Sequence, residues 1–264
     1  MERPRTLARA RRRPQAGRRA ARIPGSRCRK PAGYSAAMPT PRPHLARVLA
    51  GALLALALDV ALLAAGLGGL APLWRDGHAR GLLLVWAAGG GALALLRPVR
   101  GQDVATARRD PGSMLVLFVV PLVTPMVGAL GGRLHWLALR PANPIGWAGV
   151  GLAALGLALR IWAMAVLGPR FSPLVAVQRE HALETRGPYA LVRHPGYLGA
   201  LLACLGGALA FGSGAALPLW LVMLAAQLAR VRREEALLAE HFGAPWRAYA
   251  ARTGALLPGL GRAR

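Results

Sequence analysis

The stretch PIGWAGVGLAALGLALRIWAMAVL, residues 144–167, contains 24 residues, and Arg160 is the only charged one among them. A helix that crosses the roughly 30 Å hydrocarbon core of a membrane needs about 20 mostly apolar residues. The stretch therefore predicts a membrane-spanning helix. Arg160 would lie about 12 Å inside it, where its side chain could reach the interface, pair with Asp59 or face a polar cavity.

Five further apolar runs have a similar character, at residues 45–71, 79–97, 114–131, 196–211 and 215–230. The last two are short and are separated only by the sequence GSG, which predicts a tight helical hairpin. The composition agrees, with 55% hydrophobic residues, 17% charged residues and a mean hydropathy of +0.38. We predict an all-α, polytopic membrane protein with about six transmembrane helices, five being the alternative count, a C-terminal helical hairpin and a cytoplasmic amphipathic tail.

The net charge of +24 is distributed according to this topology. Fourteen of the 34 basic residues lie in the first 47 residues, and seven arginines follow Leu228. The arginines of the second and fourth loops would lie on the same side as both termini: Arg97, Arg100, Arg108, Arg109, Arg170, Arg179, Arg186 and Arg193. The remaining loops carry only four: Arg75, Arg80, Arg133 and Arg140. The positive-inside rule then predicts that both termini are cytoplasmic.

The N-terminal region 1–43 is rich in arginine and poor in large apolar residues, so it cannot build a core and is predicted to be disordered. It could be a tail that binds nucleic acid or anionic lipid, or an organelle transit peptide. Alternatively, translation could begin at Met38. The rest of the chain divides into N-terminal transmembrane helices, 44–143, and a predicted catalytic region, 144–264.

Acidic residues are few, and five of the ten lie between residues 180 and 241, with three of the six histidines. The hairpin 196–230 returns the chain to the side that it left. The segment RHPGY, 193–197, and the segment RVRREE, 230–235, are therefore predicted to be neighbours that share one polar pocket at the cytoplasmic end. The chain has two cysteines, which support neither a disulfide framework nor a zinc site, and no metal is expected.

Two motifs in this region carry a family resemblance when they are taken together. They are GPYALVRHPGYLG, 187–199, and RVRREEALLAEHFGAPWRAY, 230–249. As a set they resemble the isoprenylcysteine carboxyl methyltransferase family and its phospholipid N-methyltransferase relatives, over residues 146–258. The resemblance implies an integral-membrane methyltransferase that uses S-adenosylmethionine without a soluble Rossmann domain and without a metal.

Site residues follow from the resemblance position by position. Arg230 would contact the substrate and act in catalysis with His194, and Glu184 replaces a small or apolar residue found in many relatives. The resemblance assigns these residues to the cofactor pocket: Gln178, His181, Leu183, Tyr189, His194, Pro195, Tyr197, Glu234 and Glu235.

The chemistry suits these residue types, because carboxylates can bind the ammonium or ribose hydroxyls of the cofactor and aromatic faces can bind its sulfonium. An acceptor carboxylate would be oriented by Arg230 and would need no general base. An amine or thiol acceptor would need one, and His181 or His194 would be the candidates. The expected partners are a membrane and a lipid or lipid-linked acceptor, for example one of the prenylcysteine type, and no nucleic acid. The alternatives are a phospholipid, amine or small-thiol methyltransferase, or a transporter or scaffold without chemistry.

The aromatic and apolar residues of the tail recur at near-helical spacing. This pattern predicts an interfacial amphipathic segment that seals the site, formed by Leu237, Leu238, Phe242, Trp246 and Tyr249.

Overall fold

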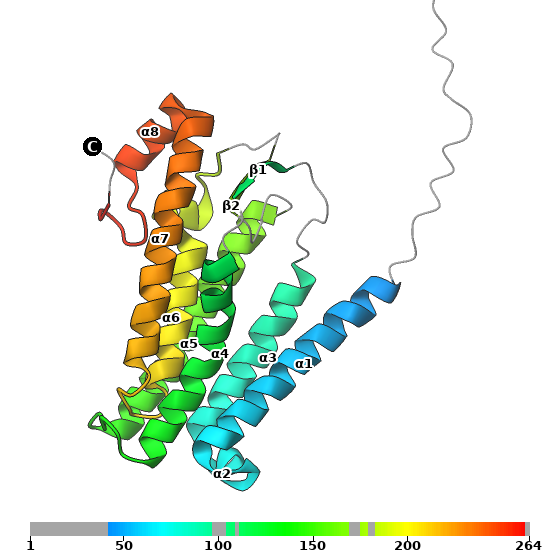
Figure 1. The fold of residues 1–264 in the computed structure, drawn as a ribbon, viewed down its shortest axis with the longest axis vertical. Coiled ribbons are helices and arrows are strands. Elements are labelled where there is room, and N and C mark those ends of the chain that lie inside the picture. Colours follow the sequence, from blue (N-terminus) through cyan, green and yellow to red (C-terminus); the bar gives the residue numbers. More distant parts are fainter. Residues whose placement is uncertain (1–41, 97–103, 109–110, 169–174, 179–182, 262–264) are drawn as a thin grey trace, which may run out of the picture. The chain divides into compact units, whose positions relative to one another are not determined.

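The computed structural model describes residues 42–96, 104–108, 111–168, 175–178 and 183–261, which belong to one compact unit of the chain. The leader predicted over residues 1–43 lies almost entirely outside the described residues. Six long helices follow one another in the described part (Figure 1): α1 Arg42–Leu67, α3 Gly77–Leu95, α4 Pro111–Arg133, α5 Ala142–Leu167, α6 Pro195–Leu209 and α7 Leu217–Phe242. Two short helices, α2 Leu70–Arg75 and α8 Ala244–Arg252, and a 3-10 turn, η2 Gly187–Ala190, complete the helical elements.

Each of the six predicted spans corresponds to one of these long helices. Three of the described helices are long and apolar enough to cross a membrane, over Leu49–Leu67, Leu115–Arg133 and Ala142–Leu167. Helix α6 is apolar but has only 15 residues. Helix α7 begins as a hydrophobic helix and continues as a charged one, ending at Phe242, twelve residues beyond the predicted end of the span at residue 230.

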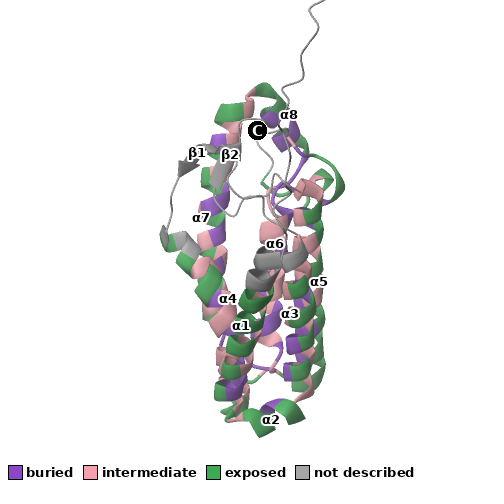
Figure 2. Ribbon diagram, turned by 90° about the vertical axis from the view of Figure 1, so that its right-hand side faces the viewer, coloured by how far each residue is buried: buried purple, intermediate pink, exposed green. Residues whose placement is uncertain are grey.

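Large apolar side chains lie on the outer faces of these helices, where a soluble protein would carry polar ones. Leu54 on α1 is 72% exposed and Phe118 on α4 is 71% exposed. Figure 2 shows exposed positions along the helices, with buried ones between them. Since the hydrophobic effect disfavours such surfaces in water, their natural solvent is the acyl chains of a bilayer. The prediction of a polytopic helical membrane protein is confirmed.

Helices α5 and α6 run antiparallel and make the closest contact in the molecule. Small residues make this contact possible: a Cβ added at Gly149 of α5 would lie 2.8 Å from the Gly206 carbonyl oxygen of α6. A Cβ at Gly156 would lie 2.5 Å from the Gly199 carbonyl oxygen. Glycine recurs seven residues apart on both helices, so one face of each presents bare backbone to the other. This contact fixes the start of α6 against the end of α5.

The structure also contains a small sheet that the prediction of an all-α fold did not include. Strands β1 Val104–Arg108 and β2 Val175–Gln178 pair antiparallel, with an irregularity between Val104 and Thr106. Helix α7 contacts β2, so the sheet lies beside the charged half of α7.

Candidate active site

Polar side chains gather where three elements meet: η2, the start of α6 and the charged half of α7. In Figure 1 this is the end of the bundle that carries α8. Pro195 is fully buried and opens α6, where its missing N–H costs no helical hydrogen bond. His194 directly precedes it as the N-cap residue. The sequence RHPGY is therefore a helix start whose side chains are held at the bundle end.

The first polar cluster joins α6 to α7. The Tyr197 hydroxyl donates to Glu234 Oε2 at 2.6 Å and accepts from Arg230 Nε at 2.9 Å. Arg230 is 3% exposed, and its guanidinium lies 5.9 Å from the centre of the Tyr197 ring. We call Tyr197, Arg230 and Glu234 the α6–α7 cluster. It places a cation, a carboxylate and an aromatic ring within one small volume.

The second polar cluster lies beside the first. Arg193 Nε donates to Glu235 Oε1 at 2.7 Å, and His194 Nε2 lies 3.3 Å from the same oxygen. The His194 ring stacks parallel to that of Tyr197 with 5.5 Å between centroids, which connects the two clusters. The predicted proximity of segments 193–197 and 230–235 is therefore confirmed. The two adjacent glutamates belong to different clusters. Glu234 bonds to Tyr197, and Glu235 contacts Arg193 and His194.

Arg193 also holds the end of the chain. Its side chain is 1% exposed, and its guanidinium donates to the carbonyl oxygens of Ala250, Thr253 and Gly261, at 3.0 Å for Ala250 and 2.7 Å for Gly261. The backbone N–H groups of Arg193 and His194 donate to the carbonyls of Gly254 and Ala255. Sequence reasoning missed this role, because Arg193 looked like one more cytoplasmic arginine. The signal that could have identified this role is the position of Arg193 directly before His194 and Pro195 in the motif.

The aromatic residues of the tail, predicted to seal the site, are buried in a small core of the protein. Trp246 and Tyr249 are 5% and 4% exposed, and Leu183, Leu238 and Phe242 pack against them. The Tyr249 hydroxyl donates to the Tyr189 carbonyl oxygen at 2.6 Å. The contacts of Arg193 hold α8 and the segment after it against the helix ends. The rings of Trp246 and Tyr249 therefore face the protein and cover η2.

Burial raises the pKa of Tyr249 from 10.0 to about 12 and also raises the pKa of Tyr189. A group whose pKa is raised by folding stabilises the fold below its unfolded pKa, and this contribution is lost as the pH rises through the folded pKa. We expect stability to fall between about pH 10 and pH 12, measured by thermal unfolding in detergent. The Tyr249→Phe variant should lose less stability over this interval, whereas an unchanged slope would contradict the assignment.

Other side chains predicted for the pocket have more varied positions. The Tyr189 hydroxyl donates to the Ala163 carbonyl oxygen of α5 at 3.4 Å. Leu183 packs against the Trp246 core, so its side chain contributes to the cover of the site. Gln178 ends β2, with its backbone in register with Val104, and His181 lies outside the described residues.

Two further charged residues, Arg160 and Glu184, form hydrogen bonds at this end of the bundle. Arg160 does not pair with Asp59 in the described part of the chain; its Nη1 donates to the Gly196 carbonyl oxygen at 2.9 Å, beside the α6–α7 cluster. Glu184 is buried and accepts from exposed Arg186 at 2.9 Å, which raises the pKa of Arg186.

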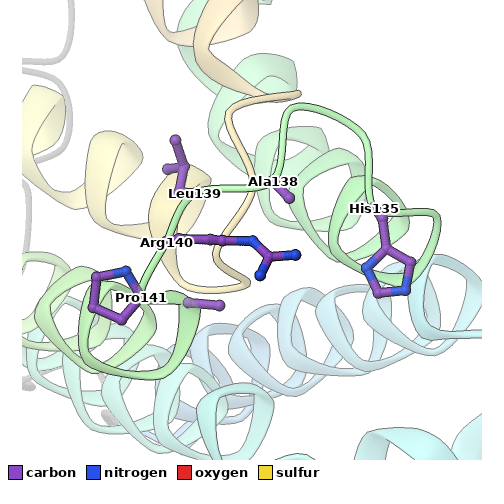
Figure 3. Close-up of a pocket in the computed structure, with 6 residues that line it drawn as sticks. His135, Ala138, Leu139, Arg140 and Pro141 are labelled. Carbon is purple, nitrogen blue, oxygen red and sulfur yellow. The ribbon is translucent and has the colours of Figure 1, made fainter.

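No group of three or more His, Cys, Asp or Glu side chains in the described ranges could hold a metal ion. A hollow of about 640 Å³ lies at the connection between α4 and α5 (Figure 3), lined by His135, Ala138, Leu139, Arg140, Pro141 and Ala142. This connection is at the opposite end of the helices from α8 (Figure 1), so the hollow is not part of the polar site.

One comparison with known protein families locates a match in this same region. Residues 145–245 match the family model described as phospholipid methyltransferase. Over 103 residues the chain is 38% identical to the protein-S-isoprenylcysteine O-methyltransferase of Schizosaccharomyces pombe, an alignment that covers 38% of this chain and 44% of the relative. The chain thus matches less than half the length of that relative.

The fold is similar to that of the eukaryotic intramembrane Ras methyltransferase ICMT (isoprenylcysteine carboxyl methyltransferase). The TM-score is 0.56 at 20% sequence identity, over 84% of this chain and 78% of that one. The region that contains both polar clusters therefore matches the phospholipid methyltransferase family model, and the chain is similar to an isoprenylcysteine O-methyltransferase, as the motifs predicted.

Proposed function

We propose that the protein is an integral-membrane methyltransferase that uses S-adenosylmethionine to methylate a lipid-linked acceptor, a prenylcysteine-type carboxylate being the best candidate. The observation that carries the proposal is the α6–α7 cluster, in which buried Arg230 and Glu234 meet at the hydroxyl of Tyr197. This cluster lies inside the region that matches the family.

The residues present fit the proposed cofactor. S-adenosylmethionine carries a positive sulfonium, an ammonium group and ribose hydroxyls. Glu234 provides a carboxylate for the ammonium or hydroxyl groups, and the stacked rings of His194 and Tyr197 provide faces that attract a cation. When bound, the cofactor supplies a methyl group already activated by the sulfonium.

The main task of the protein is then to align donor and acceptor and to exclude water. Arg230 is buried beside Glu234, and its positive charge would orient an acceptor carboxylate. Helix α8, held by Arg193 and by the bond from Tyr249 to Tyr189, would cover the site from water. A carboxylate is nucleophilic without a base, so none of these residues needs to remove a proton.

A phospholipid amine is the second candidate acceptor, favoured by the description of the matching family. An amine would need a base, and His194 is the described candidate. Its Nε2 lies 3.3 Å from Glu235 Oε1, a contact that would orient the imidazole ring.

We also propose that this end of the bundle faces the cytoplasm. The arginines near the site outnumber those at the α2 and α4–α5 end, which agrees with the positive-inside rule. A lipid-linked acceptor would then reach the site from the membrane, while the soluble cofactor would enter from the cytoplasm.

The direct test is to incubate the purified protein and a native lipid extract with radiolabelled S-adenosylmethionine and to identify the labelled product. Label in a base-labile lipid ester would support a carboxylate acceptor, and label in a phospholipid headgroup would support the amine. An absence of label in every fraction would favour a transporter or scaffold.

The variants Glu234→Ala and His194→Ala should each abolish cofactor binding, measured by calorimetry, because they remove the carboxylate and the stacked ring. Both should still insert into the membrane, since neither residue lies in the apolar part of a helix. Arg252→Met, an exposed change on α8, is the control. Retained affinity in both site variants would refute the proposed pocket.

A further inference from the structure

One side chain beside the α6–α7 cluster has no partner. Gln227 is fully buried, and neither its Oε1 nor its Nε2 forms a hydrogen bond to any other part of the described structure. Buried side-chain amides in folded proteins are almost always hydrogen-bonded, because an amide removed from water without partners is costly. Such an amide beside a candidate active site points to a ligand as its partner.

The position of Gln227 on α7 aims it into the bundle. It is bracketed by two contacts that tie α7 to α6: Trp220 Nε1 donates to the Leu201 carbonyl oxygen on one side, and Arg230 Nε donates to Tyr197 on the other. Residues 223, 227, 230 and 234 follow the spacing of one helix face. Gln227 therefore lies on the face of α7 that forms the α6–α7 cluster, about 4.5 Å along the axis from Arg230.

Gln227 also marks the inner limit of the polar region. One turn deeper, Met223 is buried in an apolar group with Val120, Leu201 and Cys204. On the other side, polar residues continue through Arg230 to Glu234. The amide thus separates a packed hydrocarbon core from a charged site, at the end of that site farthest from α8.

We propose that Gln227 binds the polar head of the methyl acceptor, with Nε2 donating to its carboxylate beside Arg230 and Oε1 accepting from an N–H next to that carboxylate. This inference rests on the proposed methyltransferase function. The assignment to acceptor rather than cofactor follows from depth: Glu234 and His194, which suit the cofactor, lie nearer the bundle end, and Gln227 lies on the membrane side of Arg230. An amino-acid derivative with an acylated amine has both groups that the amide would bind.

The test uses the full-length protein and two acceptors that carry the same prenyl chain. One is an N-acetylated prenylcysteine, and the other is a prenylthiopropionate, which has the carboxylate but no N–H. In Gln227→Met the side-chain volume is nearly kept and both hydrogen bonds are lost. We expect KM for the prenylcysteine to rise about ten- to a hundred-fold, with a smaller rise for the prenylthiopropionate and an unchanged Kd for S-adenosylmethionine.

If Gln227 served only to stabilise the fold, its replacement would lower the melting temperature. Removing an unpaired buried amide without leaving a cavity should not lower the melting temperature, so Gln227→Met should be at least as stable as the parent. Leu228→Met, a change on the exposed side of the same helix turn, is the matched control and should leave both KM values unchanged. Gln227→Leu repeats the test if the methionine variant unfolds.

Two results would overturn the inference while the proposed function stands: an active Gln227→Met protein with unchanged acceptor KM, or one in which only the cofactor Kd rises. Absence of methyl transfer in the parent protein, with either acceptor and with native lipid, would instead refute the proposed function.

Discussion

Changing Gly156 to alanine is expected to destabilise the protein, although alanine normally favours a helix. The added Cβ would lie 2.5 Å from the Gly199 carbonyl oxygen, and its other near neighbours are also backbone atoms of α6. Backbone cannot rotate away as a flexible side chain can, so α5 and α6 would have to separate. Overpacked cores typically cost about 1–3 kcal/mol, and we expect the upper part of that range.

Gly151 is the matched control, because it lies on the same helix and an added Cβ meets nothing within 4 Å. Gly151→Ala should be neutral or stabilising by up to about 1 kcal/mol, the usual gain of alanine over glycine in a helix. Melting temperatures of the two variants in detergent should therefore move in opposite directions. If Gly156→Ala were as stable as Gly151→Ala, the close α5–α6 contact would not be needed for the fold.

Replacing Arg193 with methionine should release the C-terminal segment. The guanidinium donates to Glu235 and to three carbonyl oxygens of residues 250–261, and all of these bonds are lost together. Removing one partner of a buried ion pair costs about 3–5 kcal/mol. We expect a lower melting temperature and rapid proteolytic cleavage after residue 243, with loss of any activity that needs α8 as a cover.

Arg252→Met provides the comparison, since Arg252 lies on the exposed side of α8. Within the described residues its side chain bonds only to the Ala248 carbonyl oxygen of its own helix. Its loss should change stability by less than about 1 kcal/mol. Limited proteolysis followed by mass spectrometry will compare the rate of cleavage after residue 243 in the two variants. A tail that stayed protected in Arg193→Met would show that the aromatic core around Trp246 suffices to hold it.

The six long helices were predictable because backbone in a bilayer must satisfy its own hydrogen bonds, so long apolar runs have few other choices. Helix α7 continues beyond the predicted span because its charged half is held by α6 and by the tail, and hydropathy does not register those contacts. The sheet of β1 and β2 joins segments more than sixty residues apart, and neither strand is long enough to stand out alone.

The sequence predicted which two segments meet at the site, but it did not predict which side chains within them bond to each other. The hairpin topology brought residues 193–197 and 230–235 together. Which glutamate meets which partner depends on the rotation of α7, because adjacent helical residues point about 100° apart. Arg193 and Gln227 escaped prediction for a related reason: the first was one arginine among many, and the second becomes unusual only when its surroundings are seen to lack a partner.

The backbone contact between α5 and α6 has a consequence for how this fold can diversify. Because Gly149 and Gly156 lie directly on the backbone of α6, a side chain at either position would displace that helix. Helix α7 meets α6 through longer side chains, which can be exchanged without moving the main chain. Under the proposed methyltransferase function, changes in α7 would therefore alter the preference for the acceptor, while α5 and α6 would keep the same arrangement.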